Sequence, residues 1–166
     1  DPTSAFGGII AFNTEVDAAL ATTIIERQFV EVLLATTFTA EALAVLARKP
    51  NIRVLATGTL QTSRPPALRI EQIEGGMLVQ DSDVATLAAD ALRVVSKRQP
   101  TAAELADARL AWSLVRFVKS NAILFVRDQA TIGIGAGQMS RVMSVRIAAW
   151  KAEEAGLKTA GCVMAS

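Results

Sequence analysis

The chain has 166 residues, of which 51% are hydrophobic, and this size suits one domain with a large buried core. Its 17 basic and 16 acidic residues leave a net charge of +1, so charge gives no reason to expect a nucleic acid or a membrane as partner. One cysteine and no histidine exclude an internal disulfide, argue against a bound metal such as zinc, and fit a reducing, cytoplasmic compartment.

The first third of the sequence alternates between the patterns of strands and helices. Apolar runs of strand length are separated by segments with apolar residues at helical spacing. We therefore expect a strand at residues 5–12, a helix from residue 13, a strand at 29–35, a helix at 39–48 and a strand at 51–56.

The start of the first helix is predicted from its capping residues. Asn13 and Thr14 have side chains that accept hydrogen bonds from the free N–H groups of a first helical turn. Val16, Leu20 and Ile24 follow at helical spacing and predict the buried side of this helix.

The middle of the sequence carries turn and linker signals. Residues 58–66 contain Thr, Gln, Ser and a Pro pair, which are typical of a linker. Gly75 and Gly76 separate two strand patterns at residues 68–73 and 77–80, and they predict a hairpin. One more strand is expected at residues 94–98.

A strong helix start follows this segment. Thr101 can accept from the N–H group of Glu104, whose side chain can reach back to Thr101, as in a capping box. Apolar residues at helical spacing predict the buried side of the helix. They are Leu105, Ala108, Trp112 and Val115.

The last part of the sequence predicts a strand from residue 122 and a helix at residues 140–154. Met143, Ile147 and Trp150 are expected on the buried side of that helix, and Gly156 is placed to end it. The alternation of helices and strands predicts an α/β fold with a mixed sheet flanked by helices. A glycine-containing strand followed by a helix occurs near the start and again from residue 122, which leaves open whether the chain consists of two related halves.

Three glycines at alternate positions, Gly133, Gly135 and Gly137, precede the last helix. They match neither a phosphate-binding P-loop nor a dinucleotide fingerprint, because the Lys-Ser/Thr pair and the third-glycine spacing are missing. Alternate glycines leave one face of a strand bare. That face can take either a flat ligand or the backbone of a packed helix, and the pattern alone does not decide between them.

Three polar residues are candidates for a site, each with a simpler alternative. Asn121 can both donate to and accept from a ligand amide, or it can cap a turn. Arg141 in the first turn of a helix is unfavourable for the helix dipole, which an anionic or carbonyl partner would offset. The simpler alternative is an arginine on the solvated surface. Glu31 lies within an apolar strand pattern, where it needs a partner unless the strand edge is exposed.

Five segments, in order along the chain, resemble one enzyme family. They read DPTSAFGGIIAFN, ERQFVEV, LRVVSKRQPT, FVKSNAILFV and TIGIGAGQMSRV. The ordered set resembles the transformylase domain of the AICAR formyltransferase/IMP cyclohydrolase family. The resemblance implies formyl transfer from the cosubstrate 10-formyltetrahydrofolate to the 5-amino group of AICAR in purine biosynthesis. It also implies a homodimer and a cytidine-deaminase-like α/β fold.

The resemblance assigns residues to the substrate site. Phe6, Gly7 and Glu31 match positions at the AICAR site, and so do Asn121 and Arg141. The glycine segment is then expected to let the nucleotide and the folate approach the backbone.

Two further implications concern the cosubstrate and the chemistry. Val142 matches a position that touches the folate, through its backbone. The family's Lys-His pair would lie upstream of Asp1, so no catalytic residue is expected within the chain. Residues 1–166 are therefore expected to be an incomplete portion of the transformylase domain, without the cyclohydrolase domain and inactive alone.

Two other classes of function stay open from the residues. The chain could be a non-catalytic nucleotide-binding or dimerisation module. A zinc deaminase is disfavoured, because one cysteine and no histidine cannot supply its ligands.

Overall fold

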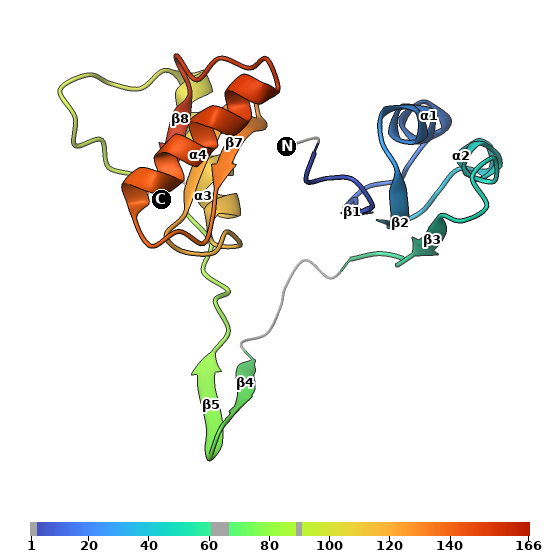
Figure 1. Cartoon of the computed structure of the whole chain (residues 1–166), viewed down its shortest axis with the longest axis horizontal. Coiled ribbons are helices and arrows are strands. Elements are labelled where there is room, and N and C mark those ends of the chain that lie inside the picture. The colour runs from blue at the N-terminus through green and yellow to red at the C-terminus, as the bar shows by residue number, and fades with distance from the viewer. Residues whose placement is uncertain (1–2, 61–66, 89–90) are drawn as a thin grey trace. The chain divides into compact units, whose positions relative to one another are not determined.

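The computed structural model of the chain describes residues 3–60, 67–88 and 91–166 (Figure 1). The chain divides into two compact units, residues 2–84 and residues 85–166, and each is described by itself. The predicted α/β class is confirmed, with parallel pairing in one sheet and antiparallel pairing in the others. None of the described helices combines the length and the apolar character that crossing a membrane requires.

The first unit contains a three-stranded parallel sheet with strand order β1-β2-β3. Helices α1 and α2 connect the strands, as the alternating pattern predicts. The elements are β1 (Gly8–Ala11), α1 (Ala18–Arg27), β2 (Val30–Ala35), α2 (Ala40–Leu46) and β3 (Arg53–Ala56).

Helix α1 begins later than its predicted caps. Asp17 is the N-cap, and its side chain accepts from the N–H group of Leu20 at 2.8 Å. The prediction of Asn13 and Thr14 as caps is wrong: both lie in a bend, and Val16 after them forms a parallel bridge with Phe38, so the helix begins only beyond this bridge. The predicted cap of α2 is confirmed, since Thr39 accepts from the N–H group of Ala42.

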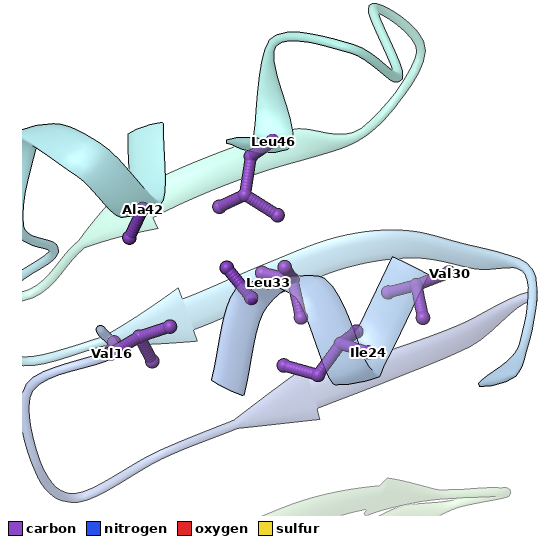
Figure 2. Close-up of a cluster of buried hydrophobic side chains, with 8 residues drawn as sticks. Val16, Ile24, Val30, Leu33, Ala42 and Leu46 are labelled. Atoms are coloured by element: carbon purple, nitrogen blue, oxygen red, sulfur yellow. The ribbon is translucent and has the colours of Figure 1, made fainter. Parts of the chain in front are cut away.

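Buried apolar side chains of α1, α2 and β2 form the core of the first unit (Figure 2). Leu33 at the centre of β2 is fully buried, with Ile24 from α1 and Leu46 from α2 in the same cluster. The pairing of β1 with β2 shifts register after Val30. Val30 and Leu33, which a regular strand would place on opposite faces, therefore belong to the same cluster, and Glu31 next to Val30 is exposed.

A β-hairpin follows in the sequence, as predicted. Strands β4 (Leu68–Ile73) and β5 (Gly76–Asp81) pair antiparallel, and Gly75 in the turn has φ +81°. A positive φ at this position explains why the turn takes a glycine. Of the predicted linker, residues 58–60 lie in no helix or strand, and residues 61–66 lie outside the described residues.

The second unit is a three-layer arrangement around an antiparallel sheet with strand order β7-β6-β8. Its elements are α3 (Ala102–Val115), β6 (Ile123–Arg127), β7 (Ala130–Gly135), α4 (Arg141–Glu154) and β8 (Val163–Ala165).

The two faces of central strand β6 contact different helices. Leu124 and Val126 pack with Ala111 of α3, whereas Ile123 and Phe125 pack with Ala148 of α4. The alternation along β6 therefore places α3 and α4 on opposite faces of the sheet, as the ribbon shows (Figure 1).

The predicted ends of both helices in this unit are confirmed. Thr101 and Glu104 form the capping box of α3, with Glu104 also paired to Arg98 at 2.8 Å. Gly156 has φ +69° and follows the C-cap of α4, where the N–H group of Leu157 returns to the carbonyl of Ala152.

Two predictions about this unit are wrong. Residues 94–98 form no strand; Ser96 donates to the carbonyl of Arg98 in a bend, and Val95 is exposed. The predicted buried sides of the helices are wrong in part: Leu105, Ala108 and Val115 of α3 are half-buried, whereas Trp112 is 57% exposed and Trp150 of α4 is 56% exposed.

Candidate functional site

The bare face of the glycine strand is covered by helix α4. A β-carbon built on Gly133 would lie 2.2 Å from the carbonyl oxygen of Ala148, and one built on Gly135 would lie 2.0 Å from that of Ser144. Both distances are far below any real contact. Of the two alternatives for these glycines, the packed helix is therefore the one found, and a ligand has no room on the face of Gly133 and Gly135.

This close approach determines which side of α4 is buried. Ser144, Ala148 and Ala152 are fully buried against the strand, while Met143 is 42% exposed. Small residues at a spacing of four let the helix backbone reach the glycines, whereas large apolar residues would hold it away. The prediction of a buried side is wrong for Met143 and Trp150 for this reason, while Ile147 is half-buried.

Gly137 differs from the two other glycines. It has φ +66°, and a β-carbon there would meet nothing closer than the side chain of Lys119 at 3.7 Å. Its N–H group donates to the carbonyl of Lys119 at 2.7 Å. Gly137 thus lets the chain turn from β7 toward α4, beside the segment that carries Asn121.

Asn121 holds this turn with four hydrogen bonds. Its backbone N–H and its side-chain Nδ2 both donate to the carbonyl of Gln138, at 3.1 and 3.0 Å. Nδ2 also donates to the carbonyl of Met139 at 3.1 Å, and the backbone carbonyl of Asn121 accepts from the hydroxyl of Ser144 at 2.6 Å. The Ser120–Asn121 peptide bond is cis.

These bonds decide which way the Asn121 amide faces. Carbonyl oxygens only accept, so the side-chain group that meets Gln138 and Met139 must be the NH₂ group. Both of its protons are used within the chain. The side-chain oxygen Oδ1 takes part in none of these bonds. Asn121 therefore caps the turn, as the simpler alternative predicted, and its Oδ1 is the half of the amide that these bonds leave unused.

Arg141 and Val142 lie in the first turn of α4, close in sequence to the turn that Asn121 binds. Both side chains are exposed. The side chain of the N-cap residue Ser140 makes no capping hydrogen bond, so it does not satisfy the first N–H groups of α4. Together with the Arg141 guanidinium, they favour an anionic or carbonyl oxygen at this end.

The first unit brings the other predicted residues together. Gly7 has φ +71°, its N–H group donates to the carbonyl of Phe29, and its missing β-carbon would lie 3.3 Å from Oε1 of Glu31. Phe6 is 74% exposed, and its ring lies 5.2 Å from that of Phe29. Aromatic rings, a carboxylate and a side-chain-free backbone thus meet at the beginning of β1 and β2.

The exposure of Glu31 has a cause in the sheet. Strand β2 is the central strand, so Glu31 does not lie on the exposed edge that one alternative supposed. It lies where the register of β1 and β2 shifts, and such bulges turn a side chain out of the regular alternation. No ion pair of Glu31 occurs among the described residues.

Comparison with known families decides the identity of the chain. The model of one family, described as AICARFT/IMPCHase bienzyme, matches residues 1–151. The chain belongs to this family. The match covers both units, and thus both groups of candidate residues.

The AICARFT/IMPCHase family consists of purine-biosynthesis enzymes, and its class is a formyltransferase/cyclohydrolase bienzyme. The described residues contain no group of three or more Cys, Asp and Glu side chains that could hold a metal ion. The two groups of predicted site residues, Phe6, Gly7 and Glu31 in one and Asn121, Arg141 and Val142 in the other, belong to different units of the chain.

Sequence reasoning missed two participants at these sites. Phe29 stacks with Phe6, and Ser144 binds the backbone of Asn121. Ser144 had a detectable signal: it lies in a run of small residues at a spacing of four, shortly after glycines at a spacing of two. Phe29 had none, because its partner is distant in sequence.

Proposed function

We propose that the chain contributes to the AICAR and 10-formyltetrahydrofolate sites of a formyltransferase of the AICARFT/IMPCHase family. The observation that carries the proposal is the orientation of Asn121. Among the described residues Oδ1 has no hydrogen-bond partner, whereas the NH₂ group of the same amide is bound by the carbonyls of Gln138 and Met139. An acceptor held in this way suits the N–H group of an aromatic amine, which is the nucleophile of AICAR.

Transfer of the formyl group needs alignment of two substrates and removal of a proton. The amine lone pair of AICAR is delocalised into its ring, which makes the amine a weak nucleophile, so positioning and proton transfer dominate the barrier. The amine forms a C–N bond to the formyl carbon and loses one proton, while the folate nitrogen leaves and gains one. In this scheme, Asn121 orients the amine and Arg141 binds an oxygen of the nucleotide.

The surroundings of the remaining predicted residues favour a binding role for each of them. Phe6 offers an exposed ring to a flat heterocycle, with Gly7 and Glu31 beside it for polar groups of the nucleotide. Val142, at the N-terminal turn of α4, offers its backbone to the folate. Both substrates belong to the proposal, as do the homodimer, the cytoplasmic location and the assignment of residues 1–166 to the transformylase domain.

Calorimetry tests the binding part of the proposal. AICAR should bind to the folded chain, and Asn121→Asp should bind it more weakly. The aspartate keeps an acceptor but cannot donate to Gln138 and Met139, so its carboxylate is repelled by their carbonyl oxygens. Folded wild-type chain that releases no heat with AICAR over a wide concentration range would contradict the proposal.

A second function, a nucleotide-binding module without catalysis, is favoured by the absence of histidine from all 166 residues. Histidine is the commonest proton acceptor near neutral pH. We expect the chain by itself to bind AICAR without transferring a formyl group. Following tetrahydrofolate absorbance with both substrates present tests this, and turnover by the chain alone would rule out the module.

A further inference from the structure

The hydroxyl group of Ser144 needs an explanation. Ser144 lies within α4 with no exposed surface, on the face formed otherwise by Ala148 and Ala152. Alanine would fill the same space, would favour the helix more and would bury no polar group. A serine here therefore costs stability unless its hydroxyl group has a strong partner.

The partner is the backbone of Asn121. Oγ of Ser144 lies 2.6 Å from the carbonyl oxygen of Asn121 and 3.5 Å from that of Ser140, so the first is the effective bond. It joins the N-terminal end of the glycine-packed face of α4 to Asn121, whose Oδ1 is the proposed ligand acceptor. The opposite end of Asn121 is held by Gln138.

We propose that Ser144 is a positioning residue for AICAR binding, acting through the backbone carbonyl of Asn121. With this bond, α4, the turn after Gly137 and Asn121 move as one body, and Oδ1 stays in one place. Without it, Asn121 loses its link to the helix that carries Arg141, and the bonds of its NH₂ group to Gln138 and Met139 are less firmly held. The inference rests on the proposed function, because it takes Asn121 as a ligand residue.

A matched set of variants separates positioning from simple stability. Ser144→Ala removes the donor, and Ser144→Cys keeps a weak donor of similar shape. Ser113→Ala is the control, because Ser113 is an exposed helical serine whose hydroxyl bonds only to the carbonyl of Arg109, four residues earlier. Each variant is first checked for folding by circular dichroism.

The measurements are calorimetry with AICAR and ¹H–¹⁵N spectra of the whole chain. Ser144→Ala should bind AICAR roughly fivefold more weakly, as expected for one hydrogen bond. The side-chain NH₂ signals of Asn121 should shift and exchange faster. Ser144→Cys should recover part of the AICAR affinity and part of the wild-type Asn121 signals. Ser113→Ala should match the wild type in both. Wild-type affinity together with unchanged Asn121 signals in folded Ser144→Ala would overturn the proposal.

The same data distinguish failure of this inference from failure of the proposed function. If the wild-type chain does not bind AICAR, the proposed function fails, and the positioning role is judged by the Asn121 signals alone. Altered signals in Ser144→Ala then support it, and unchanged signals reject it. If Ser144→Ala does not fold, Ser144→Cys is judged by the same two criteria.

Discussion

Gly135 in β7 lies directly against Ser144 in α4, so close that a β-carbon on the glycine would be 2.0 Å from the serine carbonyl oxygen. Gly133 meets Ala148 one turn further along the helix in the same way. Strand and helix approach to this distance only because neither glycine has a side chain. The glycine segment is therefore first a packing device, which brings the start of α4 to the turn held by Asn121.

The first prediction concerns this packing. Gly135→Ala should push α4 from the sheet and lower the free energy of unfolding by about 1–3 kcal/mol, the usual cost of overpacking a tight interface. Thr131→Ala, at an exposed position of the same strand, should have little effect. Urea unfolding followed by circular dichroism measures both. Equal stability of the two variants would mean that α4 does not pack on Gly135.

The second prediction concerns Arg141. Arg141→Ala should weaken AICAR binding about tenfold or more, because a charged hydrogen bond is lost. Stability should be unchanged or slightly higher, since a cation in the first turn opposes the helix dipole. Arg146→Ala, an exposed arginine further along α4, is the matched control. The same loss of affinity in both variants would show that only the general charge of α4 matters.

The third prediction is a pH dependence at the start of α3. Hydrogen bonds from Arg98, and then from the Thr101 N–H group, lower the pKa of Glu104 from 4.5 to about 2. A lowered folded-state pKa means that the carboxylate stabilises the fold above pH 4.5 and that this contribution disappears as the pH falls to about 2. Glu104→Gln should therefore be less stable than wild type at pH 7.

Thermal unfolding of both proteins at several pH values measures this contribution. The difference in melting temperature between wild type and Glu104→Gln should shrink as the pH falls between 4.5 and about 2. A difference that stays constant across this range would assign the effect to side-chain geometry and not to the charge of Glu104.

The fourth prediction concerns the turn between β6 and β7. Asp128 and Gln129 have φ 53° and 58°, which residues other than glycine seldom adopt. The buried carboxylate of Asp107 accepts from both of their N–H groups, at 3.1 and 2.8 Å, and also from the Gln129 side chain. These donors, with Gln129 foremost, lower the pKa of Asp107.

Asp107→Ala should therefore open this turn. The amide protons of Asp128 and Gln129 should exchange roughly tenfold faster, as expected when a hydrogen bond is removed. Asp128→Asn is the control, because its side chain is exposed and asparagine tolerates a positive φ. Unchanged exchange in Asp107→Ala would mean that the turn keeps its conformation without the carboxylate.

The fifth prediction concerns the two tryptophans. Both are more than half exposed, and the Lys151 ammonium lies 5.1 Å from the Trp150 ring centre. The fluorescence of the folded chain should have the red-shifted maximum of water-exposed indole and should be quenched by acrylamide. A blue-shifted, poorly quenched emission would mean that the two tryptophans are buried, as the apolar pattern of the sequence predicts.

Local signals in the sequence predicted many element ends correctly. The capping box of Thr101 and Glu104, the cap at Thr39, the turn at Gly75 and the helix end at Gly156 all depend on residues within one turn of each other. Such bonds form wherever the segment lies in the fold. The late start of α1 departs from this only because Val16 is bound by the distant Phe38.

The candidate site was predicted in part. Asn121 was identified as a cap and as a ligand residue, but the direction of its amide follows from the carbonyl oxygens of Gln138 and Met139, which a turn brings to it. Ser144 was not identified, because its role depends on a helix lying against a strand. The ligand assignments stay predictions for all of the proposed site residues, which are Phe6, Gly7, Glu31, Asn121, Arg141 and Val142.

The sequence by itself determined the α/β class, the family and most of the caps and turns, because these depend on order and on near neighbours. Only the tertiary structure decided which side of each helix is buried. Apolar residues at helical spacing predicted a buried Trp150, yet α4 turns its small residues inward because Gly133 and Gly135 let two backbones touch. Where a strand has glycines in place of side chains, close backbone packing by small helical residues stabilises the fold more than burial of the most apolar side of the helix.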